Sequence, residues 1–306
     1  MKRTIKTAAA LLFAAAIAGA AFAAPQKDRG KTQKVRIGSK NFTENLILAE
    51  IYALALEDAG IPVERTFDLA SSVVHTALTN NSIDLYPEYT GTGLLVVLKL
   101  GLETDPDEVY RLVKEGYKKQ FDIVWLNYAK ANDGQGVMVS KAASDKYGIR
   151  TISDLQRNAR NIRFASQGEF DEREDALPRL IKIYGPFRWK SSNVYADSLR
   201  YPLLSSGKAD AAPAWTTDGH LTDPQFVLLD DDKQAWPPYN IAPVVRQNVL
   251  DRYPRIADIL NAVDAKIDTP TITALNAKVD ADKREYAEVA KAFYVSTKRE
   301  CRARAG

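Results

Sequence analysis

In the first half of the chain, short hydrophobic segments typical of strands alternate with segments in which hydrophobic residues have the spacing of a helix. The pattern predicts strands at residues 34–39, 63–67 and 83–86. It also predicts a helix that begins at residue 41, has its last apolar position at residue 56 and is stopped by Gly60, and a short helix at residues 71–78. Asn41 and Glu44 have the spacing of a capping box at the start of the longer helix. This alternation of strands and helices predicts an α/β fold, in which a parallel sheet carries helices on its faces.

Ligands of open parallel sheets bind beyond the carboxyl ends of the strands. In this chain, that rule brings Ser39 and Lys40, which end the first strand, close to the segment at residues 89–92, which follows the third. The sequence therefore predicts a binding site at this edge of the sheet.

The second half of the chain repeats the first. Residues 162–167 resemble residues 35–40, and residues 196–219 align with residues 70–93 without a gap, with seven identities in 24 pairs. In this alignment, Tyr89 is paired with Trp215. Two similar α/β lobes would each direct an aromatic residue from the same loop, so we expect a cleft with an aromatic side chain on each wall. The last part of the chain, residues 249–298, has helical spacing and is predicted to pack back on the first lobe.

The first 23 residues have the pattern of an export signal. Lys2, Arg3 and Lys6 are followed by a small and apolar run at residues 7–20 and by Ala21-Phe22-Ala23, which fits a cleavage site. The alternative is a transmembrane anchor, but the run is shorter than the roughly 20 residues that cross a bilayer. We expect cleavage near Ala23, a flexible leader at residues 24–33 and a periplasmic location.

Composition and charge narrow the possible partners. The chain has 306 residues, of which 45% are hydrophobic and 26% charged, and its net charge of +3 comes from the three basic residues of the export signal. The neutral remainder argues against nucleic acid as a partner, because phosphate binding needs a basic surface. A single cysteine, Cys301, excludes an internal disulfide and a multi-thiolate metal site. Whether it is free or pairs between molecules stays open.

Groups for catalysis are few. The two histidines, His75 and His220, are far apart in the chain, so they supply neither a hydrolase triad nor a zinc site. We expect His75, which lies inside a predicted helix, to have a packed or surface role rather than to be a ligand. His220 follows the aromatic residue of the second half and could lie at the edge of the cleft or have no functional role. The acidic run at residues 171–175 contains Arg173, which argues against a bound cation there.

Aromatic residues for binding are more plentiful. Tyr89, Trp215 and Tyr239, together with Tyr86 and Trp236, lie in or beside loops that follow strands. They could instead cap the hydrophobic cores of the lobes. A trimethylammonium group has a charge but no N–H, so ring faces rather than hydrogen bonds must hold it, each contributing about 0.5–2 kcal/mol when desolvated.

A ligand that also carries a carboxylate needs donors at its other end. Arg173 and Lys40 are available, and Thr92 can add a hydroxyl group. Hydrogen bonds from an arginine to a carboxylate are strong and directional.

Five segments, in this order, resemble the substrate-binding proteins of osmoprotectant ABC importers, which take up glycine betaine, choline, carnitine and related quaternary amines. They are IGSKNFTE at residues 37–44, DLYPEYTGT at residues 84–92, ERED at residues 172–175, AWTTDG at residues 214–219 and PPY at residues 237–239. The resemblance extends over nearly the whole predicted mature chain, and the segment at residues 86–92 is its most specific part.

The resemblance implies a two-lobe periplasmic binding protein fold of type II. Lobe 1 would comprise residues 34–133 with residues 241–306, and lobe 2 residues 134–240, with the ligand in the cleft between them and hinges near residues 133–136 and 240–244. It also implies ligand-binding roles, which are an aromatic box of Tyr89, Trp215 and Tyr239, and carboxylate contacts from Lys40, Thr92 and Arg173.

One position departs from the family pattern. Gln135 stands where relatives carry a fourth aromatic residue, and relatives usually have a tyrosine where this chain has Trp215. A glutamine offers a hydrogen-bonding amide in place of a ring face. This leaves room for a smaller cation, for a cation that carries an N–H, or for Tyr128 or Trp236 to complete the box.

The resemblance further implies that the protein closes on its ligand and docks, as a monomer, on an ABC permease in the inner membrane. It implies no cofactor, no metal and no enzymatic activity. Two alternatives remain, namely the same scaffold binding another small zwitterion or an amino acid, and an exported enzyme on that scaffold. An enzyme would need a proton-transfer group in the cleft, for which His220 and the acids near Arg173 are the candidates.

Overall fold

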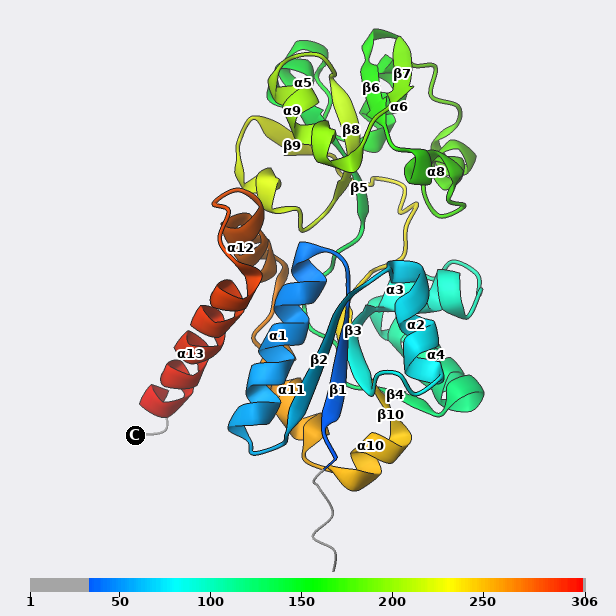
Figure 1. Ribbon diagram of the computed structural model, residues 1–306. Helices are drawn as coiled ribbons and strands as arrows, with labels where there is room; N and C mark the ends of the chain where they lie inside the picture. The colour runs from blue at the N-terminus through cyan, green and yellow to red at the C-terminus, as the bar shows by residue number, and fades with distance from the viewer. Residues whose placement is uncertain (1–32, 305–306) are drawn as a thin grey trace, which may run out of the picture. The chain divides into compact units, whose positions relative to one another are not determined.

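The computed structural model describes residues 33–304, with side chains up to residue 298 (Figure 1). The predicted export signal and cleavage site lie outside the described residues, as does all of the predicted leader but Gln33. The side chain of Cys301 lies outside them too.

The first of two five-stranded sheets has the order β2-β1-β3-β10-β4. Its strands are β1 (Val35–Lys40), β2 (Val63–Leu69), β3 (Leu85–Tyr89), β4 (Ile123–Trp125) and β10 (Ile241–Arg246). Strand β1 runs parallel to β2 and β3, whereas β10 runs antiparallel to both β3 and β4. The strands predicted at residues 34–39, 63–67 and 83–86 are therefore present, with small shifts at their ends.

The second sheet has the order β7-β6-β8-β5-β9 and repeats the directions of the first. Its strands are β5 (Gln135–Ser140), β6 (Arg163–Ser166), β7 (Ser191–Val194), β8 (Ala211–Trp215) and β9 (Phe226–Leu228). Strand β6 is parallel to β7 and β8, and β5 is antiparallel to β8 and β9. Strand β6 thus corresponds to β1 and strand β8 to β3, as the internal repeat predicts.

Helices pack against both sheets. Those that follow the strands of the first sheet are α1 (Thr43–Asp58), α2 (Ser71–Thr79), α3 (Thr90–Thr92), the π-helical turn η1 (Gly93–Val97) and α4 (Pro106–Phe121). Those around the second sheet are α5 (Lys141–Tyr147), α6 (Ile152–Asn158), η2 (Ala159–Asn161), α7 (Gly168–Glu172), α8 (Leu177–Tyr184), η3 (Asp197–Leu199), α9 (Arg200–Ser205) and η4 (Gly219–Thr222). Helix α1 ends where Gly60 adopts a positive φ of 78°.

The capping box predicted at Asn41 and Glu44 is wrong. Phe42 is the residue before α1, and no side chain caps the helix there. The side chain of Glu44 instead turns into the protein, where it accepts hydrogen bonds from Tyr89 and Asn276. A tertiary contact has replaced the local one that the spacing suggested.

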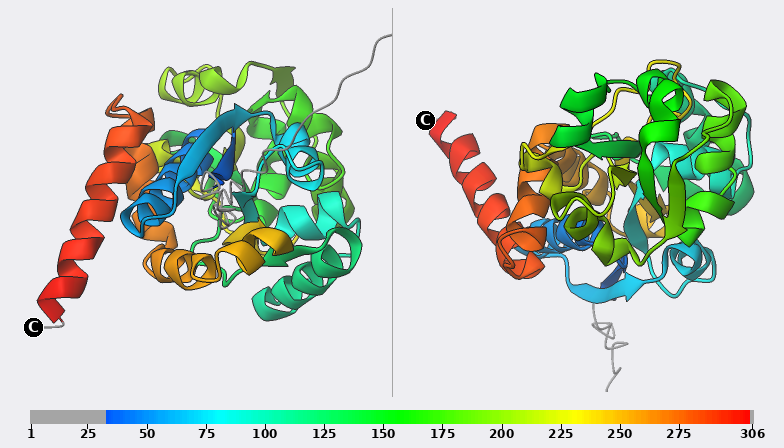
Figure 2. Two further views of the ribbon diagram at one scale, coloured as in Figure 1. Left: turned by 60° about the horizontal axis from the view of Figure 1, so that its bottom comes forward. Right: turned by 90° about the horizontal axis from the view of Figure 1, so that it is seen from above.

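The C-terminal region is helical, as predicted. It consists of α10 (Gln247–Arg252), α11 (Ile256–Asp264), α12 (Thr269–Asp280) and α13 (Tyr286–Arg304). Helices α11, α12 and α13 pack on α1, and Figure 2 shows the orange and red helices beside the blue α1. The hydroxyl group of Tyr52 in α1 donates to the buried Asp264 at 2.8 Å. Helix α12 also packs on η4, which lies between β8 and β9 of the second sheet.

Two chain segments connect the sheets, one between β4 and β5 and the other between β9 and β10. They pair through a bridge between Asn132 and Asn240, and the backbone N–H of Asp133 donates to the carbonyl oxygen of Tyr239 at 3.1 Å. Every strand falls within the lobe that the sequence predicts for it, but the boundaries and the hinge positions stay predictions. Within the described residues, no helix is long and apolar enough to cross a membrane.

Candidate functional site

One cleft of about 2090 Å³ is lined by residues that follow strands of both sheets. All seven residues that the sequence predicts to bind a ligand line it, namely Lys40, Tyr89, Thr92, Gln135, Arg173, Trp215 and Tyr239. They come from the carboxyl ends of β1, β3 and β8, from the start of β5, and from the loops and short helices beside them. The rule that places ligands beyond the carboxyl ends of parallel strands therefore locates this cleft correctly.

Tyr89, the last residue of β3, forms part of the first wall. Its side chain is buried, and its hydroxyl group donates to Glu44 at 3.1 Å and accepts a bond from Asn45 at 3.3 Å. The ammonium group of Lys40 lies 4.8 Å from the centre of the Tyr89 ring and forms an ion pair with the buried Glu88. Lys40 thus lies in the cleft wall as predicted, but its charge is already matched by a carboxylate of the protein.

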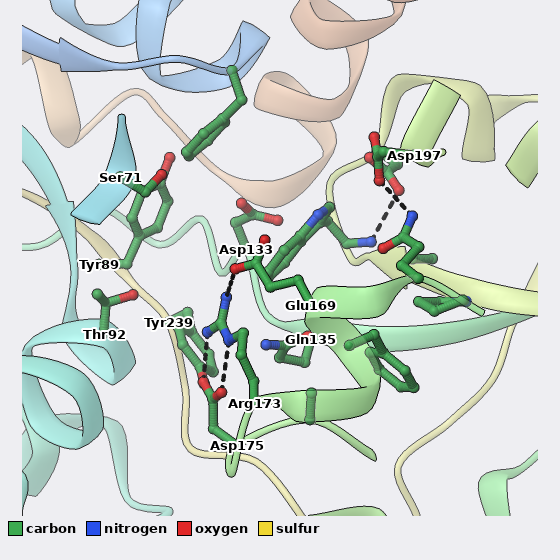
Figure 3. A pocket seen from close by; sticks show the side chains of 18 of the residues that line it. Ser71, Tyr89, Thr92, Asp133, Gln135, Glu169, Arg173, Asp175, Asp197 and Tyr239 are labelled. Atoms are coloured by element: carbon green, nitrogen blue, oxygen red, sulfur yellow. Dashed lines mark hydrogen bonds and ion pairs between the residues drawn. The ribbon is translucent and has the colours of Figure 1, made fainter. Parts of the chain in front are cut away.

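Tyr239 lies in the segment between the sheets and is 1% exposed. A Cβ atom on Gly91 would lie 2.7 Å from two carbon atoms of the Tyr239 ring, so this position in α3 has no room for a side chain. The hydroxyl group of Tyr239 donates to Asp175 at 3.3 Å. Burial, together with the charge of Asp175, raises the pKa of Tyr239 well above its ordinary value. Thr92 lines the same cleft (Figure 3).

Trp215 and Gln135 form part of the second wall. They are Cα partners in the antiparallel pair of β8 and β5, so their side chains lie on the same face of the sheet. The guanidinium of Arg173 lies 6.0 Å from the centre of the Trp215 ring. The backbone N–H of Trp215 donates to Asp218 at 2.9 Å, which fixes the turn that carries the tryptophan.

Arg173 is held from two sides by carboxylates (Figure 3). Its Nε and Nη2 atoms donate to the two oxygens of Asp175 at 2.8 and 2.7 Å, and Nη1 donates to Glu169 at 3.1 Å. Burial alone would raise the pKa of Asp175, but the hydrogen bonds and charge of Arg173 outweigh it and lower this pKa. Asp175 therefore orients both Arg173 and Tyr239, a role that the sequence did not predict.

Two further buried carboxyl groups line the cleft beside Tyr89. Glu44 accepts bonds from Tyr89 and Asn276, and Asp133 accepts a bond from Thr217 at 2.6 Å. Burial raises the pKa of both Glu44 and Asp133, and the neighbouring negative charges raise it further. Neither group forms an ion pair within the described part of the chain, so this end of the cleft favours a cation.

The other aromatic candidates lie elsewhere. Tyr128 packs on Tyr110 with ring centres 5.0 Å apart, and the buried indole of Trp236 donates to the carbonyl oxygen of Asp175 at 2.7 Å. Neither residue lines the cleft, and neither does Tyr86. The sequence analysis missed Phe42, which lines the cleft with its ring centre 5.9 Å from that of Tyr89. Its position just beyond the end of β1 is the signal that could have identified it.

The two histidines lie far apart. His75 packs against the rings of Tyr117 and Phe121, and burial lowers its pKa. His220 lines the cleft and stacks on Tyr201, with ring centres 4.4 Å apart. The described residues contain no group of three or more histidine, cysteine or acidic side chains that could hold a metal ion.

A family model for the substrate binding domain of the ABC-type glycine betaine transport system matches residues 33–296. The chain belongs to this family. Its members bind a substrate outside the cytoplasm for an ABC permease and do not transform it, so the predicted family, function class and two-lobe fold are confirmed.

Relatives within and around this family differ in the ligands they are named for. The chain is 33% identical over 294 residues to the ergothioneine transport permease/ergothioneine binding protein EgtU of Helicobacter pylori, with 95% of this chain and 52% of that protein covered. It therefore spans about half the length of that relative. It is 32% identical over 301 residues to a glycine-betaine-binding protein of Pseudomonas aeruginosa, of which it covers 93%, with 95% of its own residues aligned.

Solved structures agree with the assignment to this family. A crystal structure described as a glycine betaine/carnitine/choline ABC transporter superposes with a TM-score of 0.76 at 28% identity, covering 86% of this chain and 98% of that one.

Proposed function

We propose that this protein binds a small betaine, a molecule with a quaternary ammonium group and a carboxylate, and delivers it to an ABC permease. The observation that carries the proposal is the joint placement of Tyr89, Trp215 and Tyr239 on a cleft that also holds Arg173. Ring faces attract a cation that has no N–H, and an arginine attracts a carboxylate. Family membership supports the same reading.

The two ends of the ligand would bind different groups. The ammonium group would lie against the rings, near the buried carboxyl groups of Glu44 and Asp133, and the carboxylate would bind Arg173 with help from Thr92. Gln135 would contact the ligand beside Trp215. Lys40 would act through Tyr89 and Glu88, because its ammonium group already pairs with Glu88.

Ligand binding would be coupled to closure of the cleft. Tyr89 ends a strand of the first sheet, whereas Trp215 ends a strand of the second and Arg173 lies just after α7, which follows β6 of that sheet. A ligand that contacts both sets stabilises the closed form by the difference in its affinity for the closed and open forms. The closed protein would then dock on the permease as a monomer in the periplasm, after removal of the signal near Ala23.

The test is a thermal-shift screen of the mature protein against glycine betaine, carnitine, choline and several amino acids. A ligand that binds only the folded state at one hundred times its dissociation constant stabilises it by about 2.7 kcal/mol, which is a readily measured rise in melting temperature. We expect the largest rise with a betaine and a smaller one with choline, which has no carboxylate. A rise with amino acids alone would reject the proposal.

A second candidate ligand is ergothioneine. The Helicobacter pylori relative is named as an ergothioneine binding protein. Ergothioneine is itself a trimethylammonium betaine, and it has a sulfur-bearing imidazole ring. It belongs in the same screen. An enzymatic role would require turnover, so recovery of the bound ligand unchanged, at one molecule per protein, would exclude it.

A further inference from the structure

Arg200, the first residue of α9, has a hydrogen-bond donor that the protein leaves unused. Its Nη2 atom donates to Asp218 at 3.1 Å and lies 3.7 Å from a carboxylate oxygen of Asp197. Its Nη1 atom is buried and has no hydrogen-bond partner within the described part of the chain. The residue is 8% exposed and lines the cleft. Buried polar atoms nearly always have a partner, so the free Nη1 atom needs an explanation.

Helix α12 packs against the turn to which Arg200 is bound. Asp218 precedes Gly219, the first residue of η4, and a Cβ atom on Gly219 would lie 2.4 Å from a backbone nitrogen of α12. The amide of Asn276 in α12 donates to the carbonyl oxygen of Thr217 at 2.9 Å. Helix α12 also packs on α1, which flanks the first sheet, so it contacts elements of both sheets.

The face of α12 that lines the cleft carries two hydrogen-bond acceptors. Asn276 and Asp280 are four residues apart, so they share one face of the helix, and both line the cleft. The Oδ1 atom of Asn276 is buried and has no hydrogen-bond partner among the described residues. The carboxylate of Asp280 accepts a bond from the hydroxyl group of Thr43 at 2.6 Å, but it forms no ion pair there. This face therefore offers the acceptors that the Nη1 atom of Arg200 lacks.

The charge of Asp280 already acts on Arg200. Burial alone would lower the pKa of Arg200, but the negative charges around it, which include Asp218, Asp197 and Asp280, raise it. Asp280 is thus near the guanidinium although the two side chains form no ion pair. A ligand carboxylate at Nη1 would be repelled by these three carboxylates, so the missing partner is better supplied by the protein than by a ligand.

We propose that Arg200 and Asp280 form a latch across the cleft. When the cleft closes, the Nη1 atom of Arg200 moves onto α12 and pairs with Asp280, and the Oδ1 atom of Asn276 is its second acceptor. The contact between α12 and η4 persists in the open and closed forms and is the pivot of the movement. The latch sets the ratio of closed to open molecules whichever ligand is bound, so this inference goes beyond the proposed function.

Single-molecule energy transfer between two dyes measures the ratio of closed to open molecules. The dyes are attached at Gln120→Cys in α4 and Lys208→Cys beyond α9, which are exposed positions beside different sheets, in a Cys301→Ser background. Asp280→Asn keeps an oxygen that can accept the Thr43 bond but removes the charge. It should lower the ratio about threefold or more, both without ligand and at a fixed subsaturating concentration of glycine betaine.

Titration calorimetry measures the consequence for binding. The affinities for glycine betaine and for choline should fall by the same factor in Asp280→Asn, because the latch contacts neither ligand. Arg200→Met removes the guanidinium and keeps an aliphatic stem, and in this background Asp280→Asn should have no further effect. A direct contact between Asp280 and the ligand would instead persist there.

The matched control is Asp282→Asn, which makes the same exchange at an exposed position outside the cleft lining and should leave closure unchanged. An unchanged closed-to-open ratio in Asp280→Asn, an equal fall in the control, or a full effect of Asp280→Asn in folded Arg200→Met would overturn the latch. If Arg200→Met does not fold, the comparison of the two aspartate variants decides. If the wild type bound neither glycine betaine nor choline, the proposed function would be rejected, and the ratio without ligand would decide on the latch alone.

Discussion

The side chain of Glu169 occupies a part of Arg173 that a ligand carboxylate would need. The Nε and Nη2 atoms of the guanidinium donate hydrogen bonds to Asp175, and Nη1 donates to Glu169 at 3.1 Å. A betaine must therefore displace Glu169 from Nη1 or share this donor with it. The Glu169 side chain is 76% exposed, and exposed pairs contribute about 0.2–1 kcal/mol. Removing this competitor by Glu169→Gln should raise the affinity for glycine betaine by about 1.4- to 5-fold.

Titration calorimetry with glycine betaine and choline measures this effect. Choline has no carboxylate, so its affinity should not rise, and the ratio of betaine to choline affinity should increase in Glu169→Gln. Glu172→Gln is the matched control, because Glu172 is exposed on the same helix and lies outside the cleft lining. An equal change for both ligands, or the same change in the control, would refute the assignment of Arg173 to the ligand carboxylate.

Three further changes test other parts of the site. Trp215→Ala should weaken binding of glycine betaine about tenfold by removing a ring face, and unchanged affinity in calorimetry would contradict the aromatic box. Burial and neighbouring negative charge raise the pKa of Asp133. At pH values above the ordinary pKa of aspartate, the folded state therefore holds more protons than the unfolded state, and the stability of the fold falls as the pH rises. Asp133→Asn removes this loss of stability and should raise the melting temperature of the ligand-free protein more at pH 7.5 than at pH 5. The control Asp282→Asn, at an exposed position, should show no such difference. A similar rise at the two pH values in Asp133→Asn would argue against a titrating carboxyl group. A Cβ on Gly219 would lie 2.4 Å from a backbone nitrogen of α12, so Gly219→Ala should lower the melting temperature by about 4 °C or more, whereas Gly101→Ala, in open space, should not.

The internal repeat could be predicted from the sequence because matching residues make matching contacts in the two halves. In the first sheet, the backbone N–H of Arg36 donates to Asp84 at 2.9 Å, and its guanidinium donates to both oxygens of the same carboxylate. Arg163 and Asp210 make the same set of bonds in the second sheet, again with the N–H at 2.9 Å. The alignment of the two halves pairs Arg36 with Arg163 and Asp84 with Asp210. The same set of hydrogen bonds in each sheet is the physical basis of these matches.

The partners of individual charged residues could not be predicted in this way. Lys40 has the right position for a carboxylate contact, but its ammonium group pairs with Glu88, which lies 48 residues further along the chain. Glu44 has capping-box spacing, but it contacts Asn276 in α12, 232 residues away. Such choices depend on which side chains the fold brings together, and the spacing of residues along one element carries no information about them.

The pairing of charges inside the cleft explains why a cation should bind there even with one ring missing from the expected box. Lys40 pairs with Glu88, and Arg173 pairs with Asp175, so these charges largely cancel within the wall. The carboxyl groups of Glu44 and Asp133 form no ion pair in the described part of the chain. A cation that enters would supply the missing positive charge and favour their ionised forms. In the proposed site, selection for a positively charged head group would rest on these carboxyl groups as well as on the ring faces, so the site would not require a fourth ring at Gln135.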